Sequence, residues 1–572
     1  MSTVESPAGT SLLMGWLSSP RSDHALHFAD DEGGWRDSSY DELAALVRGA
    51  AAQIAEHGGA PGSTVVIVLP TGADFVAAFY GALLAGATPC PIAPPGYFSQ
   101  SRSYRDHLTR VLDGARPSVV LTDDFLLPEI EAAVEAADVR VAATVARFDT
   151  DAAPPPPAPL PDVALLQYTS GSTGDPRGVV VTRDNLDAHL ALASEWVSYT
   201  PDQVSAFWIP LYHDMGLIGA LLTGVAHQQT MYWLRPDQFV RRPLRWIECF
   251  GRRGASITTA PTFAFAYASK RIAPEEIADM DFSGWRFAGM GAERVDVQAV
   301  RLFAERFGPR GFRTSTISTG YGLAEATLVV TGCPVDAVPQ AALVDWRGLQ
   351  LGRPLDIERA DLETAALSAR PAEWILGCGP PLGDVSVRIV DGDGAPLPDG
   401  HLGEITVAGP TVAAGYVGGE GRPSGFRDGV LHTADAGFVL DGDLYVLGRI
   451  GDMLSVRGRN VYVEDLEARL ADVVGIPKGR FAVVAGPDEV LTIVESPPGP
   501  WADEVVRVLS RHVGEQYAVA AVSVGRGSIE RTSSGKPRRR SMWQSFSTGA
   551  LGGTVVRREG EAGARPPEGS PA

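Results

Sequence analysis

The sequence has little cysteine and almost no lysine. Four cysteines lie far apart and include no CxxC pair: Cys90, Cys249, Cys333 and Cys378. Neither a disulfide framework nor a zinc site is therefore indicated. Three lysines stand against 46 arginines: Lys270, Lys478 and Lys536. Because arginine fills nearly every generic cationic role here, each remaining lysine is a candidate for work that needs a compact ammonium.

The chain also lacks a basic start, a long apolar run and an excess of positive charge. Its first residues include Glu5 and no basic cluster, which is not typical of a signal peptide. The longest apolar helix-like run, Phe75 to Ala87, is well short of the roughly 20 residues that span a bilayer. A net charge of −20 repels nucleic acid. We expect a cytoplasmic protein with no membrane span and no nucleic-acid partner.

What is present describes a large globular protein. The 572 residues, 45% apolar and 21% charged, exceed one ordinary core, so several lobes are expected. Near the start, a helical apolar period over Tyr40–Ile54 precedes an apolar strand at Val65–Leu69, a helix at Asp74–Leu84 and a strand near Cys90–Ile92. This β-α-β pattern predicts a parallel sheet that is covered on both faces.

Changes in composition and in the hydrophobic pattern divide the rest of the chain. A proline-rich connection at 154–161 separates two α/β sublobes. The less regular segment at about 331–376 is interpreted as an insertion, and short strands with Asp/Gly turns from Asp384 predict a small antiparallel β-barrel. We expect an α/β N-terminal domain of two sublobes plus this barrel (1–448), a small mobile α+β C-terminal domain (449–545) and a disordered tail (546–572).

A run of Gly, Ser and Thr follows an apolar strand at Leu165–Tyr168. Such a loop can turn hydroxyl and backbone N–H groups inward to hold phosphate. It lacks the Gly-Lys-Ser/Thr ending of a P-loop, so a different nucleotide family is required. Taken alone, it could equally be a surface turn. The candidate phosphate-binding residues are Thr169, Ser170, Gly171, Ser172, Thr173, Gly174 and Arg177.

Further motifs follow in order: WIPLYHDMG (208–216), RPLRWIE (242–248), GAE (291–293), YGLAEAT (321–327), HTADAG (432–437), GRIGDMLSVRGRNVYVEDLE (from 448) and TSSGKPRRR (532–540). Together they resemble the adenylate-forming superfamily, which makes acyl-AMP from a carboxylic acid and ATP. Within it the chain most resembles fatty acyl-AMP ligases, which pass the acyl group to the phosphopantetheine thiol of an acyl carrier protein.

The resemblance assigns roles around ATP. Glu325 would hold Mg²⁺, a hard ion that takes carboxylate and phosphate oxygens together, although a surface glutamate is the alternative. Tyr321 would face adenine, or else be a core tyrosine. Asp435 would accept the ribose hydroxyls, with Arg449 as the second ribose contact. The remaining nucleotide contacts expected by resemblance are Gly291, Ala292, Glu293 and Gly322.

Three further residues complete the expected machinery. Lys536 would reach from the mobile domain to the substrate carboxylate and α-phosphate and stabilise charge that develops as the acyl-AMP bond forms. Gly451 would be the hinge between the two domains. His213 would lie near the acyl entrance, but a core histidine is about equally compatible with the pattern.

Four positions depart from the family pattern. Arg177 and Ala434 replace a usual lysine and glycine, Thr319 stands where proline often precedes YG, and Gly451 replaces Asp or Lys. Arginine keeps the positive charge of the phosphate loop, and glycine keeps the hinge conformationally permissive. We expect these departures to affect rate and domain motion more than the class of reaction.

The acyl acceptor is the open question. The insertion at 331–376 resembles one that fatty acyl-AMP ligases carry and acyl-CoA synthetases lack, where it is thought to restrict domain rotation. Basic residues near Arg538, Arg539 and Arg540 would offer an acidic carrier a docking surface, or be a solvated basic face. A carrier would be a separate chain. The alternatives are an acyl-CoA synthetase and a decayed acyl or nucleotide binder.

Overall fold

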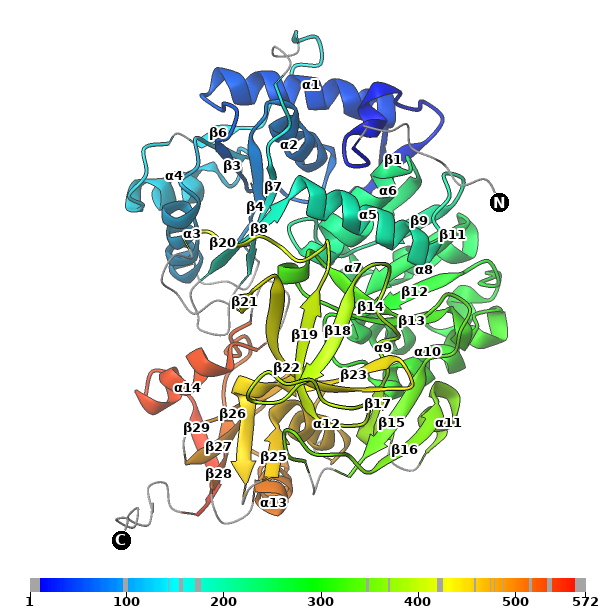
Figure 1. The fold of residues 1–572 in the computed structure, drawn as a ribbon, viewed down its shortest axis with the longest axis vertical. Coiled ribbons are helices and arrows are strands. Elements are labelled where there is room, and N and C mark those ends of the chain that lie inside the picture. The colour runs from blue at the N-terminus through cyan, green and yellow to red at the C-terminus, as the bar shows by residue number, and fades with distance from the viewer. Residues whose placement is uncertain are drawn as a thin grey trace.

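The computed structural model describes residues 11–95, 101–141, 143–153, 158–169, 176–345, 349–368, 371–418, 425–456, 459–473, 475–477, 479–486, 488–513, 517–531 and 537–560. Blue and cyan α/β layers lie at the top of Figure 1, a green and yellow middle region follows, and the orange and red C-terminal part lies at the bottom. No helix within these ranges is long and apolar enough to cross a membrane.

The first α/β sublobe is built on a four-stranded parallel sheet of order β4-β3-β5-β6. Successive residues of β3 face opposite ways: Val65 and Ile67 pack into one apolar cluster, Val66 and Val68 into another. The predicted β-α-β unit is thus confirmed. The elements are α1 (Tyr40–Glu56), β3 (Thr64–Ile67), α2 (Ala73–Leu84), β4 (Thr88–Pro91), α3 (Ser101–Ala115), β5 (Val119–Thr122), α4 (Leu127–Ala136) and β6 (Ala143–Val145).

The second sublobe contains an eight-stranded sheet of order β14-β13-β12-β11-β9-β10-β1-β2. Its six central strands are parallel, and β14 and β2 join the two edges antiparallel. The strands are β1 (Ala25–Ala29), β2 (Trp35–Ser39), β9 (Val204–Phe207), β10 (Thr230–Trp233), β11 (Ala255–Ala260), β12 (Phe287–Met290), β13 (Ile317–Gly322) and β14 (Val329–Gly332). The helices are α5 (Arg183–Val197), a π-helix (Met215–Leu222), α6 (Thr223–Ala226), α7 (Pro236–Arg241), α8 (Leu244–Arg252), α9 (Thr262–Arg271) and α10 (Val297–Phe307).

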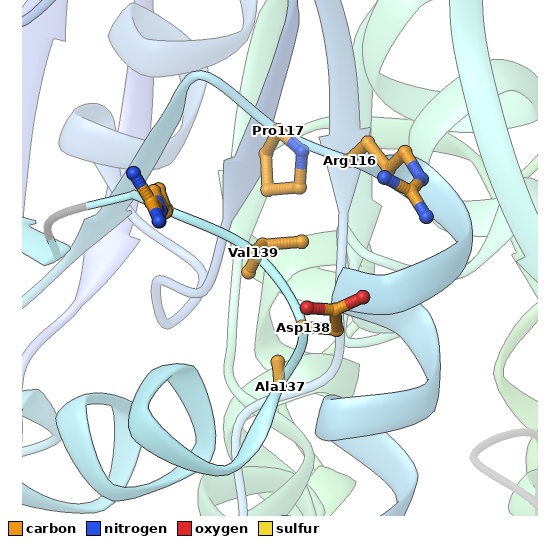
Figure 2. Close-up of a pocket in the computed structure, with 6 residues that line it drawn as sticks. Arg116, Pro117, Ala137, Asp138 and Val139 are labelled. Atoms are coloured by element: carbon orange, nitrogen blue, oxygen red, sulfur yellow. The ribbon is translucent and has the colours of Figure 1, made fainter.

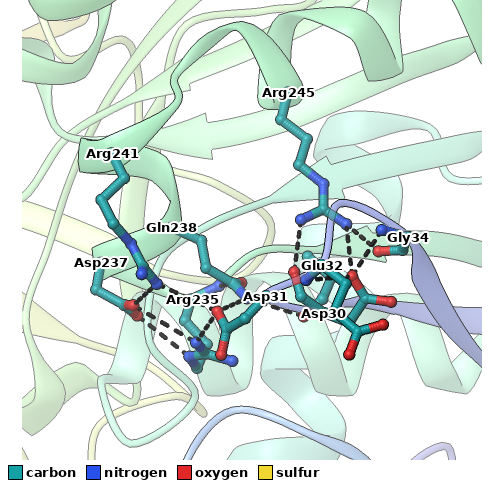
Figure 3. A network of polar contacts seen from close by, with 10 residues as sticks. Asp30, Asp31, Glu32, Gly34, Arg235, Asp237, Gln238, Arg241 and Arg245 are labelled. Carbon is teal, nitrogen blue, oxygen red and sulfur yellow. Dashed lines mark hydrogen bonds and ion pairs between the residues drawn. The ribbon is translucent and has the colours of Figure 1, made fainter.

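The RPLRWIE motif has a structural role in this sublobe (Figure 3). Arg245, almost fully buried, donates one hydrogen bond of 2.7 Å to the carbonyl of Asp30 and another to the carbonyl of Gly34. Its guanidinium lies 4.7 Å from the centre of the Trp35 ring. Because Arg245 donates hydrogen bonds to carbonyls of the β1–β2 turn, this motif holds the edge of the sheet against α8.

The predicted phosphate loop lies between two antiparallel strands, β7 (Val163–Thr169) and β8 (Arg177–Thr182), in which Thr169 is the partner of Arg177. These two strands are named the phosphate hairpin after that prediction. A third strand, β20 (Gly415–Tyr416), adds to the outer side of β8. The amide of Val417 donates to the carbonyl of Gly178 at 2.8 Å. The hairpin that carries the loop is therefore completed by a segment from the middle region.

The middle region forms a half-barrel of five antiparallel strands, as the Asp/Gly turns predicted. Its strands are β18 (Ser386–Val390), β19 (Gly403–Ala408), β21 (Phe426–Arg427), β22 (Val430–Leu440) and β23 (Asp443–Arg449). The segment interpreted as an irregular insertion is more regular than expected, since its described residues form a three-stranded sheet and a helix. These elements are β15 (Gln340–Val344), β16 (Ile357–Asp361), α11 (Leu362–Leu367) and β17 (Trp374–Leu376).

The C-terminal part contains a hairpin and a four-stranded sheet of order β26-β27-β28-β29 with helices against it. A core of its own includes Leu466, Val483 and Leu509. The elements are β24 (Met453–Val456), β25 (Arg459–Tyr462), α12 (Val463–Val473), β26 (Phe481–Ala485), β27 (Glu489–Val494), α13 (Trp501–Val513), β28 (Ala518–Ser523), α14 (Arg539–Ser547) and β29 (Thr554–Glu559).

Strand β29 corrects the prediction of a disordered tail (546–572) for residues 554–559, while residues 561–572 lie outside the described ones. Residues Thr554–Glu559 pair antiparallel with β28 and close one edge of the sheet. Composition misled because the strand is exposed and charged, which is how edge strands avoid further pairing. Its anchor is Arg558, whose guanidinium lies 2.7 Å from the carboxylate of the buried Glu489.

Loss of the Arg558–Glu489 ion pair should lower the stability of the folded protein by an amount that depends on pH. Burial raises the pKa of Glu489 and the Arg558 charge opposes that rise. A carboxylic acid whose pKa is higher in the folded than in the unfolded state makes the folded state less stable at pH values above the unfolded pKa. Arg558→Ala should therefore lower the free energy of unfolding by about 2 kcal/mol at pH 8 and by less at pH 5, measured by urea denaturation.

Arg557→Ala is the matched control, because the side chains of Arg557 and its partner Asp503 are 58% and 76% exposed. It should cost less than about 0.5 kcal/mol at either pH. Equal losses in the two variants would contradict the anchoring role of Arg558.

Candidate active site

Three of the motifs follow strands of the large sheet at the same edge. WIPLYHDMG begins just after β9, GAE begins just after β12, and Tyr321 and Gly322 are the last residues of β13. Because these strands are parallel, their carboxyl ends share one edge, where open α/β sheets bind ligands. Segments separated by about a hundred residues are thus brought to one place.

Tyr321 and the half-barrel meet at Asp435. The Tyr321 hydroxyl donates to Asp435 Oδ2 at 2.7 Å, and Arg449 Nε lies 2.8 Å from Asp435 Oδ1. Asp435 and Arg449 are also direct partners in the β22–β23 ladder. Burial, and next the charge of Asp435, raise the pKa of Tyr321 well above its ordinary value, so the phenol stays a donor. The carboxylate keeps lone pairs that can accept two ribose hydroxyls.

The GAE segment (291–293) lies against the end of β13, where Tyr321 and Gly322 stand. A side chain at Gly291 would approach the carbonyl of Gly320 to 3.1 Å, and one at Gly322 would overlap the carbonyl of Leu328. Ala292 adopts a left-handed conformation with φ 65°. Oε1 of the exposed Glu293 accepts the amide of Phe263 at 3.4 Å, which links the segment to the start of α9. The backbone thus passes close to Tyr321, where a flat base could lie.

Glu325 lies beside the phosphate hairpin. Its Oε1 accepts the Tyr416 hydroxyl at 2.7 Å, and the Arg177 guanidinium lies 5.5 Å from the centre of the Tyr416 ring. Burial, and next the charge of Glu325, raise the pKa of Tyr416. Thr169 and Arg177 flank the loop across the β7–β8 ladder. The predicted loop residues Ser170, Gly171, Ser172, Thr173 and Gly174 lie outside the described residues.

His213 is half-buried near the edge of the sheet. Its Nδ1 lies 2.7 Å from Oδ1 of Asp214, a carboxylate that orients the ring. The ring precedes the π-helix, a type of helix that often marks functional sites. An acyl-entrance role and a structural role both remain compatible with this geometry.

The four departures differ in their structural consequences. Thr319 is fully buried, and its hydroxyl is bonded to the carbonyl of Gly377 and lies 3.0 Å from Cys333 Sγ. Gly451 is exposed, and a side chain there would meet nothing within 4 Å. Ala434 has φ 58°, a left-handed conformation that favours glycine. Among the four departures, backbone strain is therefore confined to Ala434.

Restoring glycine at 434 should leave stability unchanged or improve it. Relief of about 1 kcal/mol of left-handed strain offsets about 0.4–1 kcal/mol of added entropy in the unfolded chain. Ala436, in the same strand, is buried without a positive φ, so Ala436→Gly should lower the free energy of unfolding by about 1 kcal/mol or more. Urea denaturation compares them, and a loss for Ala434→Gly as large as for Ala436→Gly would contradict the strain argument.

The C-terminal part contacts this edge through buried charges. Arg294, next to the GAE segment, lies 3.8 Å from Oδ1 of Asp465 in α12. Arg469, one turn further along α12, pairs with Asp465 at 2.9 Å and with Glu373 at 3.2 Å. Since Glu373 immediately precedes β17, the network joins three regions: the carboxyl edge of the large sheet, the C-terminal part and the 331–376 segment.

The basic stretch after the TSSGK motif is only partly a free surface. Arg539 is 15% exposed, lies 3.2 Å from Glu464 and 2.9 Å from Glu467, and donates to the carbonyl of Val483. This corrects its prediction as a docking residue, because these contacts hold α14 against its own domain. Arg540 is exposed and Arg538 is half-buried. Lys536 lies outside the described residues.

A surface pocket lies away from all of these residues (Figure 2). It is lined by Arg116, Pro117, Ala137, Asp138, Val139 and Arg140. These residues lie after α3 and after α4, in the first sublobe. Its lining includes none of the predicted site residues, so we assign the chemistry to the sheet edge instead.

The sequence analysis missed two residues of the site, Tyr416 and Arg294. Arg294 directly follows GAE, so its position was visible but its partner in α12 was not. Tyr416 contacts a residue 91 positions earlier in the chain. The signal in the sequence was AAGYVGG, a tyrosine in a turn-rich stretch between strands β19 and β21 of the half-barrel.

The donor set is compatible with ATP and Mg²⁺. Among the described residues no three acidic, histidine or cysteine side chains converge as a metal cage. Mg²⁺ in nucleotide sites is held by one or two carboxylates plus substrate phosphates, and Glu325, beside the phosphate hairpin, would supply such a carboxylate. Asp435 and Arg449 supply an acceptor and a cation where a ribose would lie. The site has the composition of a nucleotide-binding enzyme.

Comparison with known proteins agrees with this class. Residues 17–417 match the family model described as AMP-binding enzyme. A putative acyl-CoA synthetase of Caulobacter vibrioides is 30% identical over 531 residues, 90% of each chain. A medium-chain-fatty-acid–[acyl-carrier-protein] ligase of Moorena producens is 30% identical over 524 residues, 85% of this chain and 86% of that protein.

A solved structure is similar throughout. It comes from a study of fatty acyl-adenylate ligases from E. coli and L. pneumophila, is 27% identical, and has a TM-score of 0.82 over 95% of this chain and 98% of that one. The fold and site thus define an adenylate-forming ligase that uses ATP. The chain belongs to the AMP-binding enzyme family.

Proposed function

We propose that this enzyme converts a fatty or related carboxylic acid and ATP to acyl-AMP and pyrophosphate, then transfers the acyl group to the phosphopantetheine thiol of an acyl carrier protein. The observation that carries the adenylation step is the convergence of Tyr321, Asp435 and Glu325 at the sheet edge beside the phosphate hairpin. The similarity to fatty acyl-adenylate ligases supports the class of acid.

The residues have separate tasks in this reaction. An acid carboxylate must approach an anionic triphosphate, so the site must offset their repulsion. Arg177 would neutralise charge on the triphosphate, and Asp435 with Arg449 would fix the ribose. Mg²⁺, which Glu325 would hold, supplies positive charge to the phosphates when it is bound. Lys536 would stabilise charge that develops on the carboxylate and α-phosphate.

An aromatic cluster next to the carboxyl edge of the large sheet would suit an acid with an apolar group. Trp208 stacks on Phe239 at 4.2 Å and meets the ring of Phe263 edge-on at 5.6 Å. Phe263 is 49% exposed although its neighbours are buried, and Val240 is 50% exposed. Since Phe263 is joined to Glu293 through its amide, this aromatic cluster adjoins the nucleotide edge. It supports an acid with an apolar chain or ring.

The contact between the 331–376 segment and α12 supports a carrier protein as acceptor. The Glu373–Arg469 pair fixes the C-terminal part against this segment, which favours a restricted rotation. Acylation of coenzyme A remains the second candidate, supported by similarity to the acyl-CoA synthetase of Caulobacter vibrioides.

Acid-dependent pyrophosphate exchange over acids of several chain lengths tests adenylation. Intact mass of a holo-carrier incubated with the enzyme, alongside a coenzyme A reaction, tests the acceptor. We expect exchange with apolar acids and an acyl-carrier product without acyl-CoA. Acyl-CoA as the sole product would establish the second candidate, and no exchange would indicate a decayed binder.

The docking proposal is tested by charge reversal at Arg540. Arg540→Glu should slow acyl transfer to the carrier severalfold and leave acyl-AMP formation unchanged, because Arg540 is exposed. Arg511→Glu is a control at an exposed arginine of α13 in the same domain. Arg539 is unsuited to this experiment, since its reversal would break ion pairs within the domain. An unchanged transfer rate for Arg540→Glu would exclude docking there.

A further inference from the structure

Tyr416 occupies a position between the two charged groups that flank the phosphate hairpin. Its hydroxyl donates to Glu325 Oε1 at 2.7 Å, while its ring lies under the Arg177 guanidinium at 5.5 Å. In the described part of the chain no ion pair joins Arg177 to Glu325. One half-buried phenol therefore contacts both an anion and a cation.

The backbone around Tyr416 is fixed on both sides. Tyr416 is the partner of Val179 in the β20–β8 ladder, and the amide of Ala414 donates to the carbonyl of Val180 at 2.9 Å. The amide of Ala413 donates to the carbonyl of Glu325 at 2.9 Å. The segment is thus bonded to the phosphate hairpin and to the Glu325 turn, and Tyr416 has little freedom to move relative to either.

These contacts matter because Arg177 and Glu325 carry opposite charges. A direct ion pair between them would occupy the carboxylate that a cation needs and the guanidinium that phosphate needs. A phenol that donates to one carboxylate oxygen leaves the other oxygen available. The ring beneath the guanidinium positions Arg177 beside the hairpin, and the Tyr416 hydroxyl also interacts with it.

We propose that Tyr416 is a positioning residue that holds Glu325 and Arg177 apart and oriented, so that the two do not form an ion pair with each other and remain available to metal and triphosphate. This inference rests on the proposed function, because it takes Glu325 as the metal ligand and Arg177 as a phosphate ligand. Tyr416 itself touches neither the acid nor the reacting phosphorus in this assignment. Its contribution is made through the two charged side chains.

The test measures binding rather than turnover. The full chain is saturated with α,β-methylene-ATP, whose α,β bond cannot be cleaved, and Mn²⁺ affinity is read from the electron paramagnetic resonance signal of free Mn²⁺. Nucleotide affinity without metal is measured separately by calorimetry. The variants are Tyr416→Phe, Tyr416→Leu and Glu325→Gln. Tyr445→Phe is the control, because the buried Tyr445 hydroxyl has no hydrogen-bond partner in the described structure.

Tyr416→Phe should weaken Mn²⁺ binding about tenfold, the effect of losing one charge-assisted hydrogen bond, and change metal-free nucleotide affinity less than twofold. Tyr416→Leu should weaken Mn²⁺ binding similarly and lower nucleotide affinity about two- to fivefold, because the ring beneath Arg177 is lost. Tyr445→Phe should match the wild type in both measurements.

Two results would overturn the inference in distinguishable ways. Wild-type Mn²⁺ affinity in Tyr416→Phe, with a loss in Glu325→Gln, would reject the positioning role and leave the proposed function intact. Wild-type affinity in Glu325→Gln would reject Glu325 as metal ligand and the inference with it. Should Tyr416→Leu fail to fold, Tyr416→Phe, which keeps the ring, still decides between these outcomes.

Discussion

Replacement of Lys536 by alanine should lower the rate of acyl-AMP formation about a hundred- to thousandfold, which is the usual cost of losing one preorganised electrostatic donor. The reason is that a single ammonium would stabilise charge that appears on the substrate carboxylate and α-phosphate only in the transition state. Single-turnover formation of acyl-AMP measures the effect directly, without the later transfer step.

Lys270→Ala is the matched control for this experiment. Lys270 is one of the other two lysines, lies exposed on α9, and should be dispensable. Lys536→Arg should also lose most of the rate, because a planar guanidinium does not reproduce a point charge on a flexible stem. Both Lys536 variants should keep the wild-type unfolding midpoint. Wild-type acyl-AMP formation by Lys536→Ala would end its assignment as the catalytic lysine.

Replacement of Asp465 by alanine should lower the free energy of unfolding by about 3–5 kcal/mol, because it removes a buried carboxylate that lies 3.8 Å from the buried Arg294 and 2.9 Å from Arg469. Burial already lowers the pKa of Arg294, and Asp465 opposes that shift. Urea denaturation gives the total loss, and hydrogen exchange along α12 shows whether the docked helix opens first.

The expected loss depends on burial, which supplies the control. Glu504 and Arg507 form an exposed pair on α13, each 43% exposed, so Glu504→Ala should cost less than about 1 kcal/mol. The double variant Arg294→Met with Asp465→Leu should recover part of the stability, since both charges are removed together. A loss for Asp465→Ala no larger than for Glu504→Ala would show that the network does not hold the domain.

The fold was predictable where periodicity was strong. The apolar strand at Val65–Leu69 and the helix at Asp74–Leu84 match β3 and α2 closely, because both are buried over most of their length. Strand β29 was not predictable from composition, because it contributes few apolar contacts. Besides its backbone ladder with β28, it is held by the pair of Arg558 with a buried carboxylate two strands away.

The site was predictable as a set of residues but not as a set of contacts. Motif resemblance named Tyr321, Asp435 and Arg449, and the structure brings these three together. The ion pairs of Arg539 could not be predicted, because its carboxylate partners in α12 lie 72 and 75 residues earlier in the chain. A run of arginines in a sequence gives charge, and only tertiary structure shows which of them are already neutralised.

The segment at 410–417, which leaves the half-barrel and pairs with the phosphate hairpin, also affects how the protein folds during its own synthesis. Asn185, at the start of α5, donates hydrogen bonds to the carbonyls of Pro410 and Val412, the latter 227 residues later. Strand β20, a few residues beyond, completes the sheet of the hairpin. A chain emerging from the ribosome can therefore build its first parallel sheet long before its nucleotide site. The ability to bind ATP should arise late and abruptly during translation, once residues up to Arg449, which pairs with Asp435, have left the exit tunnel.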